Sequence, residues 1–150
     1  MKLNGSVFGI TPTVGNTPFW TVESTSSTQI VAIQEVTMGG ELTSSTAMRT
    51  RVRRDNAVGV GARTAGSVQR LDQCTATAGN AAFFSTNYTT TAPTNVAGGL
   101  GVFSWNANGG YIRWLAAPGE EFIISIVASI SAVADVGTGT SSYSVIWTEF

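Results

Sequence analysis

The chain has 150 residues, a formal net charge of −1, no histidine and a single cysteine, Cys74. These counts exclude a Ser-His-Asp triad, a Cys-His nucleophile pair, a histidine-based zinc site and a disulfide within the chain. Only 11% of the residues are charged, against about a quarter in typical soluble domains. The surface is therefore either neutral and polar or covered by partners, which predicts an oligomer or a lattice component without a cofactor. The near-zero net charge gives no argument for nucleic acid or an anionic membrane as partner.

The N-terminal residues 1–18 are expected to form an arm ahead of one domain over 19–150. The stretch MKLNGSVFGITPTVG lacks the sustained apolar core of a secretory signal. The longest apolar run, from Phe122 to Ile130, is much shorter than the ~20 residues that a membrane helix needs. We therefore expect the whole chain to be the mature protein, made in the cytosol and not bound to a membrane.

The next segment is predicted to form strands separated by turns. A short strand is expected around Phe19 to Val22, a longer one from Gln29 to Met38, and another from Ser67 to Leu71. Between them, AMRTRVRRDN alternates in polarity, so Met48, Thr50 and Val52 point to one face and the arginines between them to the other.

Four of the seven arginines lie within the six residues RTRVRR. On a strand, Arg49, Arg51 and Arg53 form a ladder with steps of about 6.7 Å. The ladder could bind phosphate, pair with carboxylates of a neighbouring chain, or form a solvated edge that discourages aggregation. Arginine favours planar, bidentate contacts, and the absence of other basic clusters argues against nucleic acid. A subunit or partner contact is thus the favoured role.

Residues 72–99 form the least regular part of the chain, long enough to suggest a functional, interfacial or partly disordered segment. Three aromatic residues in it argue against simple disorder: Phe83, Phe84 and Tyr88. Cys74, at its start, is expected to be a small buried residue.

The C-terminal third predicts more strands. LGVFSW (100–105) and YIRWL (111–115) flank NANGG, a hairpin signal because these residues accept positive φ. APGEE fits a type II turn with Pro118 and Gly119 at its centre. The strand over 121–133 is apolar on both faces, so it is central or lies against another subunit, with Phe122, Ile124 and Ile126 as interface candidates. With SSYSVIWTEF (141–150), the chain predicts an all-β, single-domain antiparallel β-sandwich or jelly roll of about seven or eight strands.

The Glu120-Glu121 pair is the strongest candidate for acid-base chemistry, as in glycosidases. Adjacent strand residues point to opposite faces, so the two carboxylates diverge. We therefore predict no catalytic residues here and an exposed turn, with one carboxylate pairing Arg113 across the hairpin.

Aromatic residues recur along the predicted strands. At strand spacing they are more often core residues than sugar-stacking ones. Tyr88 and Trp105 are kept as candidates for facing a ligand.

Three stretches carry a resemblance: EVTMGGELTSSTAMRTRVRR (35–54), GGYIRWLAAPGEEFII (109–124) and YSVIWTEF (143–150). In this order they resemble small structural proteins of tailed bacteriophages and prophages. The resemblance implies a non-enzymatic virion component, made in the host cytoplasm, of the head decoration (cement) type, whose partner is the major capsid protein. A tail or baseplate part, or a carbohydrate-binding module for host attachment, is the alternative. A homotrimer at a capsid three-fold axis is our expectation for its assembly.

Overall fold

A computed structural model describes residues 1–15, 17–59, 64–71, 81–84, 99–125 and 127–150. The described residues contain no α-helix, and therefore none that could span a membrane. Their eleven strands are β1 (Lys2–Ile10), β2 (Trp20–Ser24), β3 (Val31–Gly40), β4 (Ala47–Asp55), β5 (Ser67–Arg70), β6 (Ala81–Phe84), β7 (Gly101–Asn106), β8 (Tyr111–Leu115), β9 (Phe122–Ile124), β10 (Ala128–Val136) and β11 (Ser141–Glu149).

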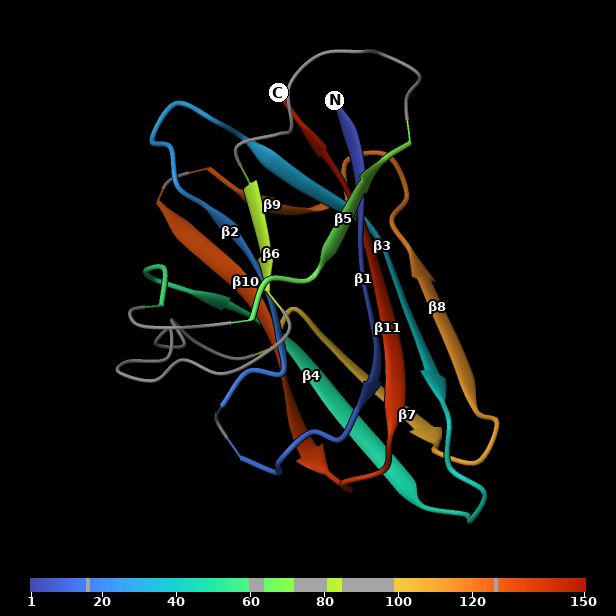
Figure 1. The fold of residues 1–150 in the computed structure, drawn as a ribbon. Coiled ribbons are helices and arrows are strands. Elements are labelled where there is room, and N and C mark those ends of the chain that lie inside the picture. Colours follow the sequence, from blue (N-terminus) through green and yellow to red (C-terminus); the bar gives the residue numbers. More distant parts are fainter. Residues whose placement is uncertain (16, 60–63, 72–80, 85–98, 126) are drawn as a thin grey trace.

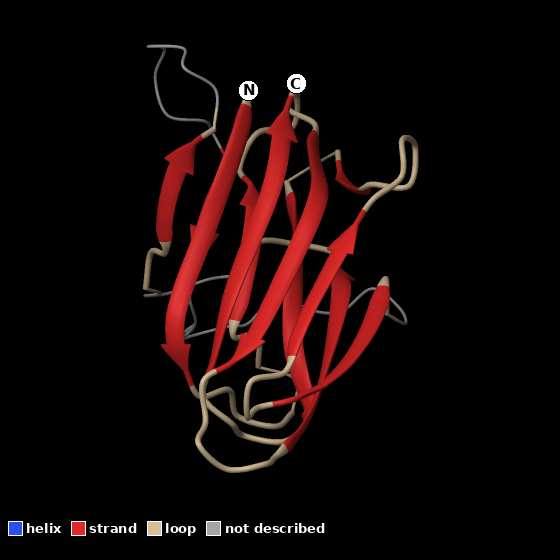
Figure 2. Cartoon of the chain, turned by 90° about the vertical axis from the view of Figure 1, so that its right-hand side faces the viewer, coloured by secondary structure: helices blue, strands red, loops and turns tan. Residues whose placement is uncertain are grey.

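The strands form two antiparallel sheets (Figures 1 and 2). The first, sheet A, has the order β5-β1-β11-β3-β8, with β9 also paired to β3, and the second, sheet B, has the order β6-β2-β10-β4-β7. The chain passes repeatedly from one sheet to the other, as in a jelly roll. The predicted all-β sandwich is confirmed. Its strand number is higher than predicted because β1 and β6 were not expected as strands and the run 121–133 contributes to both β9 and β10.

The core lies between the sheets and is rich in aromatic rings. Phe83 lies between Trp20 and Trp147, with ring centroids 6.5 and 6.2 Å apart. Phe19 and Tyr143 are 4.6 Å apart, and burial raises the pKa of the Tyr143 phenol to about 12. These rings come from both sheets, so they join the two layers by close packing.

The expected N-terminal arm is wrong for residues 2–10. They form β1, which lies between β5 and β11 in sheet A. Leu3 is buried in the core, and a Cβ at Gly5 would lie only 2.5 Å from Phe83 Cγ. The missing side chain at Gly5 thus leaves room for a core ring, a close approach that the sequence alone does not reveal.

The predicted hairpin at 106–110 is also wrong. β7 pairs with β4 in sheet B, whereas β8 pairs with β3 in sheet A. The turn itself is present, with Gly109 at φ 68°. Ala107 is bonded through its N–H to Thr46 O and through its carbonyl to Leu42 N. Those bonds fix the turn to the β3–β4 connection, so the chain crosses between sheets here.

The apolar run at 121–133 is not one strand. β9 pairs with β3 in sheet A, and β10 pairs with β2 and β4 in sheet B. The predicted Pro-Gly turn before it is confirmed, because Gly119 has φ 87° and Glu120 N–H donates to Ala117 O at 2.9 Å. β10 is central in sheet B and is buried on both faces over residues 128–134. The chain's own layers therefore cover this strand, which is the first of the two predicted alternatives.

Candidate interaction site on the outer face of sheet B

Strand β4 places its residues as the alternation predicts. Met48, Thr50 and Val52 are buried toward the core, and the arginines lie on the outer face of sheet B. The three arginines do not share one environment, however. The exposed fraction of the side chain is 49% at Arg49, 28% at Arg51 and 3% at Arg53.

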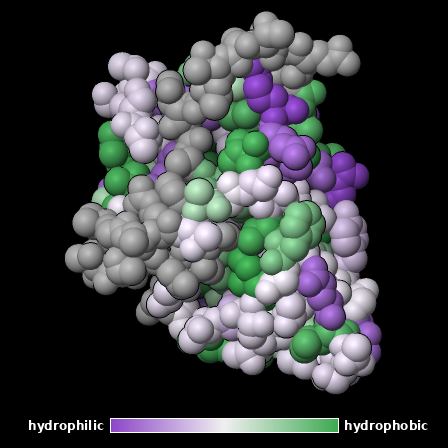
Figure 3. Space-filling view, viewed as in Figure 1, coloured by the Kyte–Doolittle hydropathy of each residue, from purple (hydrophilic) through white to green (hydrophobic). Residues whose placement is uncertain are grey.

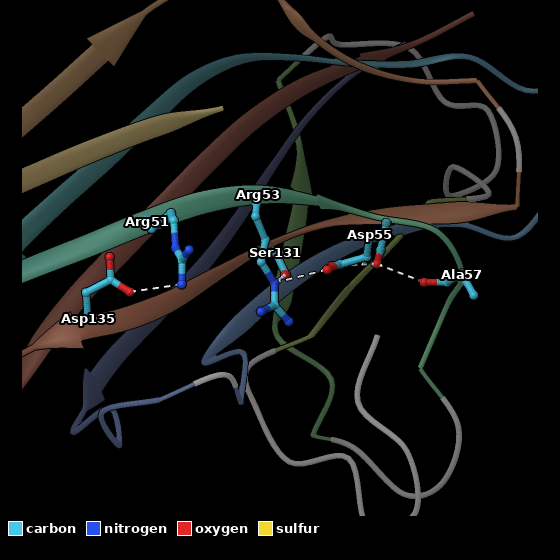
Figure 4. A network of polar contacts seen from close by, with 7 residues as sticks. Arg51, Arg53, Asp55, Ala57, Ser131 and Asp135 are labelled. Atoms are coloured by element: carbon cyan, nitrogen blue, oxygen red, sulfur yellow. Dashed lines mark hydrogen bonds and ion pairs between the residues drawn. The ribbon is translucent and has the colours of Figure 1, made fainter. Parts of the chain in front are cut away.

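Arg53 belongs to a buried polar network with Asp55 and two serines of β10 (Figure 4). Its Nε donates to Ser131 Oγ at 3.2 Å and lies 3.0 Å from Asp55 Oδ1. Because the single Nε proton is directed at Ser131, the contact with Asp55 is an ion pair without hydrogen-bond geometry. Ser129 Oγ lies 3.1 Å from Asp55 Oδ2 and 3.2 Å from Ala57 O, and its single proton is shared between these two acceptors.

The chain after β4 covers this network. Ala57 O accepts from Ser129, and the Gly59 N–H donates to Glu23 Oε1 at 3.2 Å. Burial raises the pKa of Asp55, opposed by its hydrogen bond with Ser131 and the charge of Arg53. The prediction that Arg53 contacts a partner is therefore wrong: its guanidinium is used to hold β4, β10 and the following turn together.

Arg49 and Arg51 share one carboxylate at the other end of β4. Asp135 lies at a register shift in β10, with Oδ1 3.1 Å from Arg51 Nη2 and Oδ2 3.8 Å from Arg49 Nε. Two guanidinium charges against one carboxylate leave one positive charge. Arg51 Nε has no hydrogen-bond partner but is itself buried, so an acceptor from outside would meet the exposed parts of the two arginine side chains.

Two exposed valines adjoin these charges. Val102 of the edge strand β7 is 58% exposed and pairs with Arg51, while Val136 pairs with Arg49. We name Arg49, Arg51, Val102, Asp135 and Val136 the arginine patch. Arginine beside exposed apolar groups is a composition typical of protein interfaces. This patch can bind a carboxylate and bury apolar surface in the same contact.

Of the apolar interface candidates, Ile124 lies inside the sandwich and Phe122 is partly buried against the core. Ile124 is buried, and Phe122 packs against the core with its ring stacked on Trp114 at 4.1 Å and 10°. Ile126 lies outside the described residues. Ile124 is therefore not available to a partner, and the contact with Trp114 covers one face of the Phe122 ring.

One of the two aromatic candidates for facing a ligand is also buried. Trp105 is buried, with its ring edge-on to Tyr143 at 6.3 Å and 81°, so its proposed role in facing a ligand is wrong. Tyr88 and Cys74 lie outside the described residues.

Neither Glu120 nor Glu121 pairs with Arg113, contrary to the prediction. Arg113 donates instead to both carboxylate oxygens of Glu35, at 2.8 and 3.0 Å, and this bidentate bond lowers the pKa of Glu35. Glu121 accepts from Gly119 N–H at 2.9 Å. Glu121 therefore stabilises the turn.

The sequence alone does not reveal which side chains contact the arginines of β4. Asp55, Ser129, Ser131 and Asp135 come from two strands that are far apart in the chain, and their register decides which side chains meet. The alternating polar residues of ASISAVADV were the available signal, because a buried strand places them all on one face.

Within the described residues, no three histidine, cysteine, aspartate or glutamate side chains are grouped so that they could hold a metal ion. No protein-family model matches the sequence, and neither a curated protein nor a solved structure is similar enough to count as a match.

Proposed function

We propose that the protein is a non-enzymatic structural component of a tailed-phage virion, of the head decoration type, that binds the major capsid protein and copies of itself. The proposal rests on the sequence resemblance over 35–54, 109–124 and 143–150. The fold is compatible with it, because a rigid β-sandwich with few charges offers broad neutral surfaces for packing against a shell.

Among the structural observations, the arginine patch gives the proposal its strongest support. Much of the described surface in Figure 3 is pale, that is, neither strongly hydrophilic nor strongly hydrophobic. Against this neutral background, the patch combines a net positive charge with Val102 and Val136 on the outer face of sheet B. A carboxylate on the capsid or on a neighbouring copy, surrounded by apolar atoms, is the matching partner surface.

We keep the homotrimer in the proposal, but the surface through which it would form is different from the one expected from the sequence. The apolar run that suggested it is used within the chain, so self-association has the arginine patch and the exposed β7 edge as its surfaces. Sedimentation of the purified protein, free and bound to particles, tests the trimer. A monomer under both conditions would remove it.

Locating the protein on the virion tests the function itself. Purified virions are separated into heads and tails, and each fraction is analysed by mass spectrometry. We expect the protein in the heads, in a fixed ratio to the major capsid protein. Its presence only in tails would assign it to the tail or baseplate, and its absence from both fractions would overturn a virion role.

A further inference from the structure

The outer face of sheet A, on the opposite side of the sandwich from the arginine patch, carries a groove of about 490 Å³. Figure 2 shows this sheet from its outer side. The groove crosses all five strands of the main sheet order, because its lining includes residues of β5, β1, β11, β3 and β8. Its size is within the range of small-ligand sites.

A row of hydroxyl side chains forms part of the groove floor. Ser67 pairs with Ser6, Ser6 with Ser144, and Ser144 with Thr37 on successive strands. Strands are about 4.8 Å apart, so the hydroxyls recur at an interval comparable to the length of one sugar unit. Ser142, also in the lining, has a buried Oγ without a hydrogen-bond partner.

Two exposed aromatic rings contribute to the lining. Phe8 of β1 is 74% exposed and Tyr111 of β8 is 65% exposed. On β3, Tyr111 pairs with Gly39, where a Cβ would meet no atom within 4 Å. The space beside Tyr111 is therefore open, and the ring is available for stacking.

Amide groups also line the groove, and none of its lining residues within the described part of the chain is charged. Asn4 pairs with Gln69 on β5, and Asn4 Oδ1 accepts from Ser144 Oγ at 2.7 Å. That bond orients the Asn4 carboxamide and leaves its two N–H groups to donate. Hydroxyls, carboxamides and aromatic faces without charge match a ligand that has many hydroxyls, C–H faces and no ionised group.

We infer that this groove binds a neutral saccharide, with Tyr111 stacking on a sugar ring and the serine row and Asn4 bonding its hydroxyls. A second protein surface fits the groove less well, because its apolar atoms would bury the floor hydroxyls without hydrogen-bond partners, which is unfavourable. The inference does not depend on particle attachment, since the arginine patch lies on the other sheet.

An array of neutral oligosaccharides, with sialylated and sulfated glycans as anionic controls, tests the inference on the purified full-length protein. We expect binding to neutral glycans, weakened about fivefold in Tyr111→Ala, which is the affinity equivalent of an aromatic stacking contact of about 1 kcal/mol. Gly39→Val fills the open space beside Tyr111 and is expected to weaken binding as well. Arg49→Ala, on the opposite sheet, is the matched control and should bind as the unchanged protein does.

Thermal unfolding separates a lost site from a lost fold. Tyr111→Ala should keep its Tm because the ring is exposed, so it tests the site even where Gly39→Val does not fold. Three results would overturn the inference. The protein binds no neutral glycan, it binds anionic glycans alone, or both variants bind as the unchanged protein does. A Tyr111→Ala protein that dissociates from an oligomer without any glycan binding would overturn it in favour of a second copy of the chain.

Discussion

The two ends of the β4 arginine ladder carry the same side chain on the same face of one strand, but in opposite surroundings. Arg53 is enclosed by Asp55, Ser131 and the chain that follows β4, whereas Arg49 and Arg51 share Asp135 at the more exposed end of the strand. Alternation decides which face a residue occupies. The segments that pack over that face decide whether the charge supports the fold or remains available to a partner.

The comparison predicts the largest loss of stability at the buried end. Arg53→Ala leaves the Asp55 carboxylate buried without its counter-charge, so the free energy of unfolding should fall by about 3–5 kcal/mol. Urea denaturation measures this difference, with Arg49→Ala as the control on the same strand. Equal stability of the two variants would break the distinction between the ends.

Removal of a serine from the buried polar network should lower the stability by an intermediate amount. Ser129→Ala deletes the hydroxyl whose single proton is shared between Asp55 Oδ2 and Ala57 O. Hydrogen bonds to charged groups contribute about 1.5–3 kcal/mol, so the denaturation midpoint should shift accordingly. Ser104→Ala, on the exposed outer side of β7, is the matched control. A Ser129→Ala protein as stable as that control would show that the network contributes little.

At the exposed end, the change in stability should be small. Arg51→Ala is expected to lower the free energy of unfolding by no more than about 1 kcal/mol, because its ion pair with Asp135 is partly solvated. Added salt should reduce that difference further by screening the pair, and should leave the Arg53→Ala difference nearly unchanged. A loss as large as that of Arg53→Ala would mean that the patch is a structural element.

The free energy of unfolding should depend on pH through two carboxylates, Glu35 and Asp55, in opposite directions and by smaller amounts. The pKa of Glu35 is lowered by Arg113, so its stabilising contribution is lost as the pH falls from the ordinary glutamate pKa through its pKa in the fold. The pKa of Asp55 is raised by burial, so its contribution is complete below the ordinary aspartate pKa and is lost as the pH rises through its pKa in the fold.

Acid unfolding of two amide variants measures these signs. Relative to the unchanged protein, Glu35→Gln should lose less stability on acidification, and Asp55→Asn should lose more. Identical acid profiles of both variants would contradict the assigned directions.

Local pattern predicted the all-β sandwich, the polarity of β4 and the Pro-Gly turn, because alternation and turn chemistry act between near neighbours. The same patterns failed where distant segments decide the outcome. Two examples are Trp105, whose burial depends on Tyr143 of β11, and Arg53, whose burial depends on β10 and the chain after β4.

The groove on sheet A was missed for the same reason. Its hydroxyls come from separate serines and threonines that only the strand register brings into one row. Phe8 lies in the stretch expected to be a terminal arm, and Tyr111 lies on a predicted strand, where spacing favours a core position for an aromatic residue. No spacing in the sequence connects these residues, so the site becomes visible only with the sheet.

Attachment to particles tests the central claim most directly, namely that the open end of the ladder binds a partner while the buried end maintains the fold. Particles that lack the protein are incubated with the unchanged protein or with the double variant Arg49→Glu/Arg51→Glu, and bound copies are counted. The account predicts that the double variant keeps its Tm within a few degrees and binds at least about tenfold less, equivalent to ~1.4 kcal/mol. Full occupancy by a folded double variant would contradict it.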